Sequence, residues 1–120
     1  MKQSLVKEKS YAFALRAIEA VRRLQARNEW VLSKQFLRSA TSIGANVEEA
    51  LAGQSRADFV AKMAIASKEA RETNYWLRLL RDSKLMDERC AGELLPMSEE
   101  IIRMLTSIVK TTQTGKQGSS

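Results

Sequence analysis

A chain of 120 residues is long enough for one domain that buries its own core. Five glycines and one proline leave little turn chemistry for a many-stranded sheet, whereas the abundant Ala, Leu, Arg, Glu, Lys and Met all favour helices. Twenty Lys and Arg against 14 Asp and Glu give a net charge of +6, which favours an anionic partner.

The absence of histidine excludes the commonest catalytic and metal sites. With no histidine and one cysteine, the sequence has no Cys/His zinc site, no Ser-His-Asp triad and no Glu-x-x-His pair of a di-iron bundle. Gly44 and Gly53 stand alone, without the spacing of a phosphate-binding loop. We therefore expect a protein that is not an enzyme, with no catalytic residue, no metal and no cofactor.

The same composition indicates a compartment. Cys90 has no second cysteine to pair with, which fits a reducing environment. No apolar run approaches the roughly 20 residues of a membrane span, and "MKQSLVKEKS" lacks the apolar stretch of a signal peptide. We expect a cytoplasmic protein that does not associate with membranes.

Helix-breaking and capping residues divide the chain. The first helix is predicted over about residues 4–27, ending near Asn28. The second begins near Ser33 as N-cap and ends at about residue 52, where Gly53 suits a C-terminal cap. Ser55 caps the third helix, with Asp58 three residues on as in a capping box, and this helix runs to about residue 82.

The fourth helix is predicted from near Asp87 to about residue 111, with Pro96 inside it. Because proline removes a backbone hydrogen bond and clashes with the preceding turn, we expect a kink, or a break with Ser98 as a new N-cap. Residues 112–120 are polar and rich in Gly and Ser, which predicts a disordered tail after a bundle over residues 1–111.

Apolar residues recur at helical spacing in all four segments, each forming one face. The faces are Ala14, Ala17, Ile18, Val21 and Leu24; Leu32, Phe36, Ala40, Ile43, Val47 and Ala50; Phe59, Met63, Ala66, Ala70 and Leu77; and Leu94, Met97, Ile101, Leu105 and Ile108. Four amphipathic helices with short connections predict an all-α, antiparallel, up-down-up-down four-helix bundle.

The third helix carries a second apolar face. One bundle core cannot receive both sides of a helix, so this face must be buried against something else. Its aromatic residues could cover a loop or the end of the first helix, but Trp and Tyr are enriched at subunit interfaces. We expect an oligomer interface with mixed polarity, made by Ile65, Glu72, Tyr75, Trp76 and Leu79.

Polar residues interrupt the inward faces of two helices. Asn46 and Ser42 flank the apolar face of the second helix, and Asn74 lies within that of the third. A buried amide must find hydrogen-bond partners. We expect Asn46, Ser42 and Asn74 to form a buried polar network that fixes helix register, with a ligand site as the alternative.

Two stretches carry a family resemblance. "QFLRSATSIGANVEEA" at residues 35–50 and "SRADFVAKMAIASKEARETNYWLRLL" at residues 55–80 resemble the bacterial four-helix-bundle family named after proteins encoded in 23S rRNA intervening sequences. The similarity covers about residues 10–110. Gly44 stands where many relatives place proline.

The resemblance implies a left-handed bundle that assembles into a ring, typically a homopentamer, with no known catalytic activity and no established general function. A distant branch comprises accessory proteins of diversity-generating retroelements, which bind nucleic acid and a reverse transcriptase. The motifs of this chain do not support assigning it to that branch.

Positive charge is concentrated on the first and third helices. Residues 1–28 hold seven Lys and Arg and two Glu, a net +5, and residues 55–84 hold seven against four, a net +3. On the first helix a basic stripe lies away from the core face, formed by Lys9, Arg16, Arg23 and Arg27. Such a stripe is either a solvated face or a surface that contacts phosphates.

Two functions remain open from the sequence. One is an oligomer that binds RNA or single-stranded DNA, alone or with a polymerase, through the nucleic-acid backbone and with little sequence specificity. The other is a protein–protein interaction scaffold with no nucleic-acid role. A membrane-surface role is disfavoured because the basic stripe lacks bulky apolar neighbours.

Overall fold

Four helices make up almost all of the chain. The computed structural model describes the backbone of residues 2–119 and the side chains of residues 2–114. The helices are α1 (Lys2–Ala26), α2 (Val31–Ala52), α3 (Arg56–Asp82) and α4 (Glu88–Ser119). Residues 2–119 contain no strand, so the all-α prediction is confirmed.

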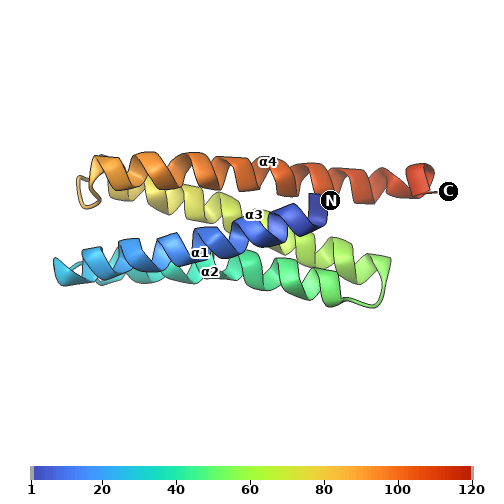
Figure 1. Cartoon of the computed structure of the whole chain (residues 1–120), viewed down its shortest axis with the longest axis horizontal. Coiled ribbons are helices and arrows are strands. Elements are labelled where there is room, and N and C mark those ends of the chain that lie inside the picture. The colour runs from blue at the N-terminus through green and yellow to red at the C-terminus, as the bar shows by residue number, and fades with distance from the viewer. Residues whose placement is uncertain (1, 120) are drawn as a thin grey trace.

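The helices run alternately up and down in a narrow bundle of 53 × 21 × 19 Å, with short connections at both ends (Figure 1). α1 contacts α2, α2 contacts α3, α3 contacts α4, and α4 contacts α1. Within the described chain, neither α1 and α3 nor α2 and α4 are in contact. α1 and α3 therefore occupy opposite corners of the bundle, and the predicted antiparallel four-helix architecture is confirmed.

The predicted apolar faces supply most of the core. Its largest fully buried side chains come from all four helices and include Phe13, Phe36, Ile43, Met63, Leu77, Leu80, Leu94, Ile101 and Leu105. Ile18 was assigned to the core and is instead exposed. The buried side of α1 passes through Phe13, Ala17 and Leu24, and Ile18 lies 100° further round the helix than Ala17.

The start of α2 differs from the prediction. Ser33 is buried inside the helix rather than being its N-cap. The side chain of Glu29 takes the capping role: its carboxylate accepts hydrogen bonds from the backbone N–H of Val31, Leu32 and Ser33 at 3.2, 3.0 and 2.7 Å. A carboxylate here satisfies otherwise unpaired N–H groups and also suits the positive end of the helix dipole.

The predicted connection between α2 and α3 is confirmed. Gly53 is the C-cap of α2, and its N–H donates to Ala50 O. Its φ of −67° is open to any residue, but an added Cβ would lie only 3.2 Å from Ala50 O, so the close fit and not the backbone angle favours glycine here. Ser55 is the N-cap of α3, where its Oγ accepts from the N–H of Asp58 at 3.0 Å.

Pro96 does not break α4, which continues through it. Ser98 is buried and donates its Oγ to Leu95 O at 2.8 Å, so it does not cap a new helix. The proline ring meets the turn that begins at Gly92, four residues earlier. Gly92 is exposed, and a Cβ placed there would have open space around it. The proline ring therefore does not occupy the space beside Gly92, and glycine is not needed there to accommodate it.

The far end of α4 also differs from the prediction. The helix continues to Ser119 instead of ending near residue 111, so the backbone of residues 112–119 is helical where a disordered tail was predicted. Residue 120 lies outside the described residues. Thr112 and Thr114 donate their Oγ1 to the carbonyls four residues earlier at 2.7 and 2.9 Å. These bonds give both hydroxyl groups a partner within the helix.

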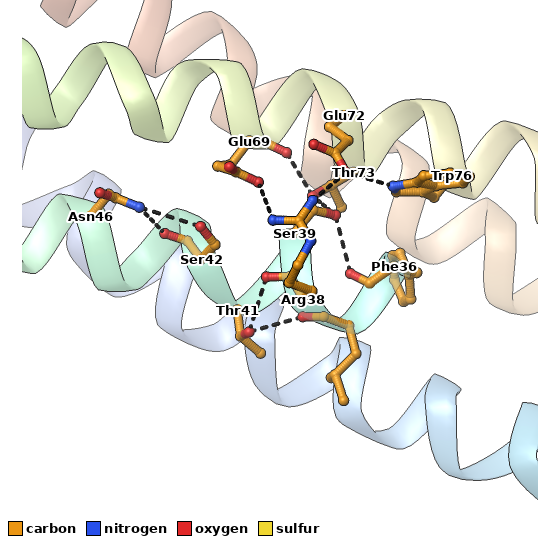
Figure 2. Close-up of polar contacts among 11 residues, drawn as sticks. Phe36, Arg38, Ser39, Thr41, Ser42, Asn46, Glu69, Glu72, Thr73 and Trp76 are labelled. Atoms are coloured by element: carbon orange, nitrogen blue, oxygen red, sulfur yellow. Dashed lines mark hydrogen bonds and ion pairs between the residues drawn. The ribbon is translucent and has the colours of Figure 1, made fainter. Parts of the chain in front are cut away.

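A buried hydroxyl pair joins α2 to α3. Thr73 and Ser39 are both fully buried, and Thr73 Oγ1 donates to Ser39 Oγ at 2.8 Å (Figure 2). Thr73 Oγ1 also lies 2.7 Å from Glu69 O, and Ser39 Oγ donates to Phe36 O at 3.2 Å. Buried hydroxyls need hydrogen-bond partners, and this pair favours the observed alignment of the two helices along their length.

We predict that Thr73→Val lowers the free energy of unfolding by about 1–2 kcal/mol. Valine keeps the shape but leaves the Ser39 hydroxyl with fewer partners in a buried site. Urea unfolding at fixed protein concentration measures the change as a lower midpoint with an unchanged slope. Thr111→Val is the matched control, because Thr111 is exposed. Equal midpoints for the two variants would contradict the prediction.

Candidate assembly faces and basic surface

The outward side of α3 carries a row of exposed apolar side chains. Ile65 is 40% exposed, Tyr75 46% and Leu79 36%. Ala61, one turn before Ile65, is also exposed. We call this row the α3 face. The spacing of these residues places them on one side of the helix. The bundle leaves this side uncovered, as the sequence analysis predicted for the second apolar face of the helix.

Two residues predicted to belong to the same interface make contacts within the chain. Trp76 is half-buried and packs against the core. Its Nε1–H donates to Glu72 Oε2 at 3.0 Å, and Glu72 also pairs with Arg38 of α2 (Figure 2). Trp76 and Glu72 therefore lie where α2 meets α3, and their part in a subunit contact stays a prediction.

Arg38 ties α2 to α3 through two carboxylates. Its Nη1 lies 3.2 Å from Glu69 Oε1, and its Nη2 pairs with Glu72. The hydrogen bond from Trp76, together with the Arg38 guanidinium, holds the pKa of Glu72 below that of an isolated glutamate. The bond to Glu72 raises the pKa of Arg38, so both groups stay charged. This network closes one side of the α3 face.

Tyr75 is held in place by its neighbours on α3. Its ring meets that of Trp76 edge-on, with ring centroids 5.3 Å apart, and the Arg78 guanidinium carbon lies 5.7 Å from the Tyr75 centroid. Both geometries are favourable aromatic contacts. An ordered, exposed aromatic ring loses little conformational freedom when it becomes an interface anchor.

A second apolar face, which the sequence reasoning missed, lies on α1. Tyr11 is 61% exposed, Leu15 51% and Ile18 36%. We call this row the α1 face. Its spacing of four and then three residues is that of one helix side, so it could have been recognised from the sequence. Assigning Ile18 to the core concealed it. Because α1 and α3 are at opposite corners, the two faces point to opposite sides of the bundle.

The basic stripe lies along the side of α1 that meets α4, where acidic residues neutralise half of it. Lys9 Nζ lies 3.3 Å from Glu100 Oε1. Arg16 pairs with Glu93 of α4, and its Nε lies 3.5 Å from Glu19 Oε1. These ion pairs reduce the charge that the predicted stripe offers to a phosphate, and whether the stripe contacts one stays a prediction.

The other two members of the stripe keep their charge available. Arg27 Nη1 donates to the carbonyl of Leu85 at 3.2 Å, and Arg23 is exposed. Neither has a carboxylate partner within the described part of the chain, and nor does exposed Arg22 beside them. Within the predicted stripe, the charge without a carboxylate partner is therefore at the C-terminal end of α1.

The predicted polar network is divided into separate contacts. Asn46 is half-buried and hydrogen-bonded, but to its own helix: Nδ2 donates to Ser42 O at 2.9 Å and lies 3.3 Å from Ser42 Oγ (Figure 2). Asn74 Nδ2 donates to Ser98 Oγ of α4 at 3.0 Å. The register-fixing pair is Thr73 with Ser39, so the three predicted residues do not form one buried network.

The described residues contain neither a cluster of metal ligands nor a membrane-spanning helix. Among the side chains that the structure describes, no three acidic or cysteine residues gather in a way that could hold a metal ion. Within residues 2–119, no helix is both long enough and apolar enough to cross a bilayer.

Known proteins with a similar sequence and fold identify the family of this four-helix bundle. The family model described as 23S rRNA-intervening sequence protein matches residues 2–107, which include all of α1, α2 and α3 and most of α4. The chain belongs to this family. The match extends beyond the segments that suggested the resemblance and includes the α1 face as well as the α3 face.

A solved member of the S23 ribosomal protein family, from Bacteroides thetaiotaomicron, has the same fold. It is described as a protein of unknown function, and its crystal structure matches with a TM-score of 0.89 and 47% sequence identity. The match covers 92% of this chain and 100% of that one. No match was found among curated proteins. For this member of the 23S rRNA-intervening sequence family, function must be argued from its surfaces.

We predict that Glu72→Gln lowers the free energy of unfolding at pH 7 by about 1 kcal/mol, since a charged hydrogen-bond acceptor is lost. Because folding lowers the pKa of Glu72, its stabilisation is present above the unfolded-state value of about 4.3 and is lost as the pH falls through the folded-state value. As the pH falls below 5, the free energy of unfolding should therefore decrease less for the Glu72→Gln variant than for wild type.

Glu99→Gln is the control for this experiment, because Glu99 is exposed and has no ion pair in the described chain. Urea unfolding at several pH values provides the measurement. Parallel pH curves for wild type and Glu72→Gln would show that the network adds nothing to stability.

Proposed function

We propose that the chain is a non-enzymatic assembly unit in which the α1 face of one copy packs against the α3 face of the next. The observation that carries the proposal is the pair of exposed apolar rows on helices at opposite corners. Single exposed apolar residues are ordinary on a protein surface, but a continuous row that includes an aromatic is typical of an interface. Tyr11 and Tyr75 supply one aromatic to each row.

The opposite placement favours a head-to-tail contact. A symmetric dimer through either row would leave the other row in water. A head-to-tail contact covers both rows in every copy, and it closes into a ring when the rotation per copy divides a full turn. Membership of the family supports a ring of five copies as the state to test.

We predict that Leu15→Glu and Leu79→Glu each give monomers that remain helical. Either change places a charge in a desolvated contact, at a cost of several kcal/mol per contact. Light scattering coupled to gel filtration measures the mass, and circular dichroism checks the fold. Ala45→Glu on the exposed outward side of α2 is the control and should assemble as wild type does. A wild-type chain that is monomeric at tens of micromolar would contradict the proposal.

Mixing the two variants separates head-to-tail from symmetric assembly. A Leu15→Glu copy keeps its α3 face and a Leu79→Glu copy keeps its α1 face, so one intact contact can form between them. We expect a dimer and nothing larger. Assembly of Leu15→Glu by itself would instead indicate a symmetric contact through α3.

A second candidate function is binding of nucleic acid, either RNA or single-stranded DNA, alone or with a polymerase partner. The supporting observation is the group of exposed arginines near the end of α1, Arg22, Arg23 and Arg27, together with the net charge of +6. Repetition around a ring would multiply both the field and the avidity. Lys9 and Arg16 contribute less, because their carboxylate partners already neutralise them.

We predict that Arg22→Gln/Arg23→Gln weakens binding to single-stranded RNA of any sequence. It should also reduce the slope of log K against log salt by about 1.4, because two phosphate contacts are lost. Fluorescence polarisation at several salt concentrations measures both. Arg103→Gln/Lys110→Gln on α4 has the same change in charge and should retain the wild-type slope. If both double variants weaken binding equally, the attraction depends on net charge alone and the site at the end of α1 is rejected. If the wild-type protein does not bind RNA, the protein–protein scaffold is favoured.

A further inference from the structure

A cavity lies at the end of the bundle where α1 ends and α3 connects to α4. Its volume is about 290 Å³, close to the lower limit for small-molecule pockets. Its wall is apolar and is made by Ala20, Leu24, Leu85, Met86 and Cys90. Four of these side chains belong to the buried core, so the cavity reaches from the surface to the core itself.

Positive charge lines the mouth of this cavity. Arg23 and Arg27 lie one helical turn apart on α1 and both line it. The hydrogen bond from Arg27 Nη1 to Leu85 O, at 3.2 Å, holds that guanidinium against the connection between α3 and α4, which also lines the cavity. Asp87 is the acidic residue of the lining, and its Oδ1 accepts from the backbone N–H of Arg89 at 3.3 Å.

A polar hollow of about 440 Å³ adjoins the cavity and shares Arg23, Asp87 and Cys90 with it. Arg16, Arg89 and Glu93 complete the hollow, and Arg16 pairs with Glu93. Arg23 and Arg89 are thus the hollow's arginines without a carboxylate partner in the described chain. Apolar space with a cationic mouth and a polar annex matches a molecule that is apolar at one end and anionic at the other.

We propose that this cavity binds a small amphipathic anion, with its apolar part against Leu24, Leu85 and Met86 and its carboxylate or phosphate between Arg23 and Arg27. Burial of the apolar part removes it from water. Guanidinium groups hold such oxyanions through paired, charge-assisted hydrogen bonds. The proposal does not depend on self-assembly. It differs from nucleic-acid binding, because phosphates along a strand would contact the same arginines without filling the apolar wall.

The test uses the full-length protein with octanoate and octyl phosphate as probes, and 1-octanol and acetate as matched controls. The ε-methyl signal of Met86 reports occupancy by nuclear magnetic resonance. Both eight-carbon anions should shift it in a saturable way, whereas octanol, without charge, and acetate, without an apolar part, should bind about tenfold more weakly or not at all. The relative affinity of the two anions shows which head group is preferred.

Cys90 provides an independent readout, since it is the chain's one cysteine and lines the cavity. Burial raises the pKa of its thiol, so alkylation by iodoacetamide is followed at alkaline pH. Octanoate at saturation should slow the alkylation severalfold, and acetate at the same concentration should not. An unchanged alkylation rate with octanoate would overturn the proposal.

Arg27→Gln should weaken the binding of both anions about tenfold or more while leaving octanol binding unchanged. Arg103→Gln is the matched control, because it removes the same charge from exposed α4, about 20 Å along the helix from Cys90. Circular dichroism confirms that both variants are folded. Octanol binding as tightly as octanoate, or equal affinities for wild type and Arg27→Gln, would overturn the proposal.

Discussion

Each helix of this bundle has two neighbours, and the arc that points away from them has no partner within the chain. Around one core, a helix can bury the side facing the core and the two seams beside it. The outward arcs of α2 and α4 carry many charged residues, as Lys34 with Glu48 and Arg103 with Glu99 illustrate. Those of α1 and α3 are apolar, and this difference between corners gives the molecule two sides that are not equivalent to the rest of its surface.

The seams explain why polar residues recur close to the core. At the α2–α3 seam, Arg38 bridges Glu69 and Glu72, and Trp76 donates to the same carboxylate. At the α1–α4 seam, Lys9 and Arg16 meet Glu100 and Glu93. Exposed ion pairs contribute little stability individually. Their larger effect here is on the surface: they use up charge along both seams, whereas Arg22, Arg23 and Arg27 at the end of α1 have no carboxylate partner in the described chain.

Local signals in the sequence were sufficient for the fold and insufficient for the surfaces. Periodicity located four helices, and Ser55 marked a cap that involves residues only three apart. The Glu29 cap was missed because its carboxylate caps the backbone two to four residues ahead, and no sequence pattern distinguishes such a glutamate from another acidic residue in a loop. The neutralisation of Arg16 by Glu93 spans 77 residues and exists only once α4 lies beside α1. The contacts around Trp76 were hidden for the same reason, since the Glu72 carboxylate that Trp76 bonds is also held by Arg38 of another helix.

The buried hydroxyl pair has a consequence beyond the stability of one bundle. Thr73 and Ser39 contribute to setting the height of α3 against α2, and through α2 its height against α1. A slip by one helical turn would raise the α3 row by about 5.4 Å relative to the α1 row. Each head-to-tail contact would then add a translation to its rotation, and successive copies would climb along a screw axis. Under the proposed head-to-tail assembly, these two buried hydroxyl groups would therefore bear on whether successive copies close into a ring.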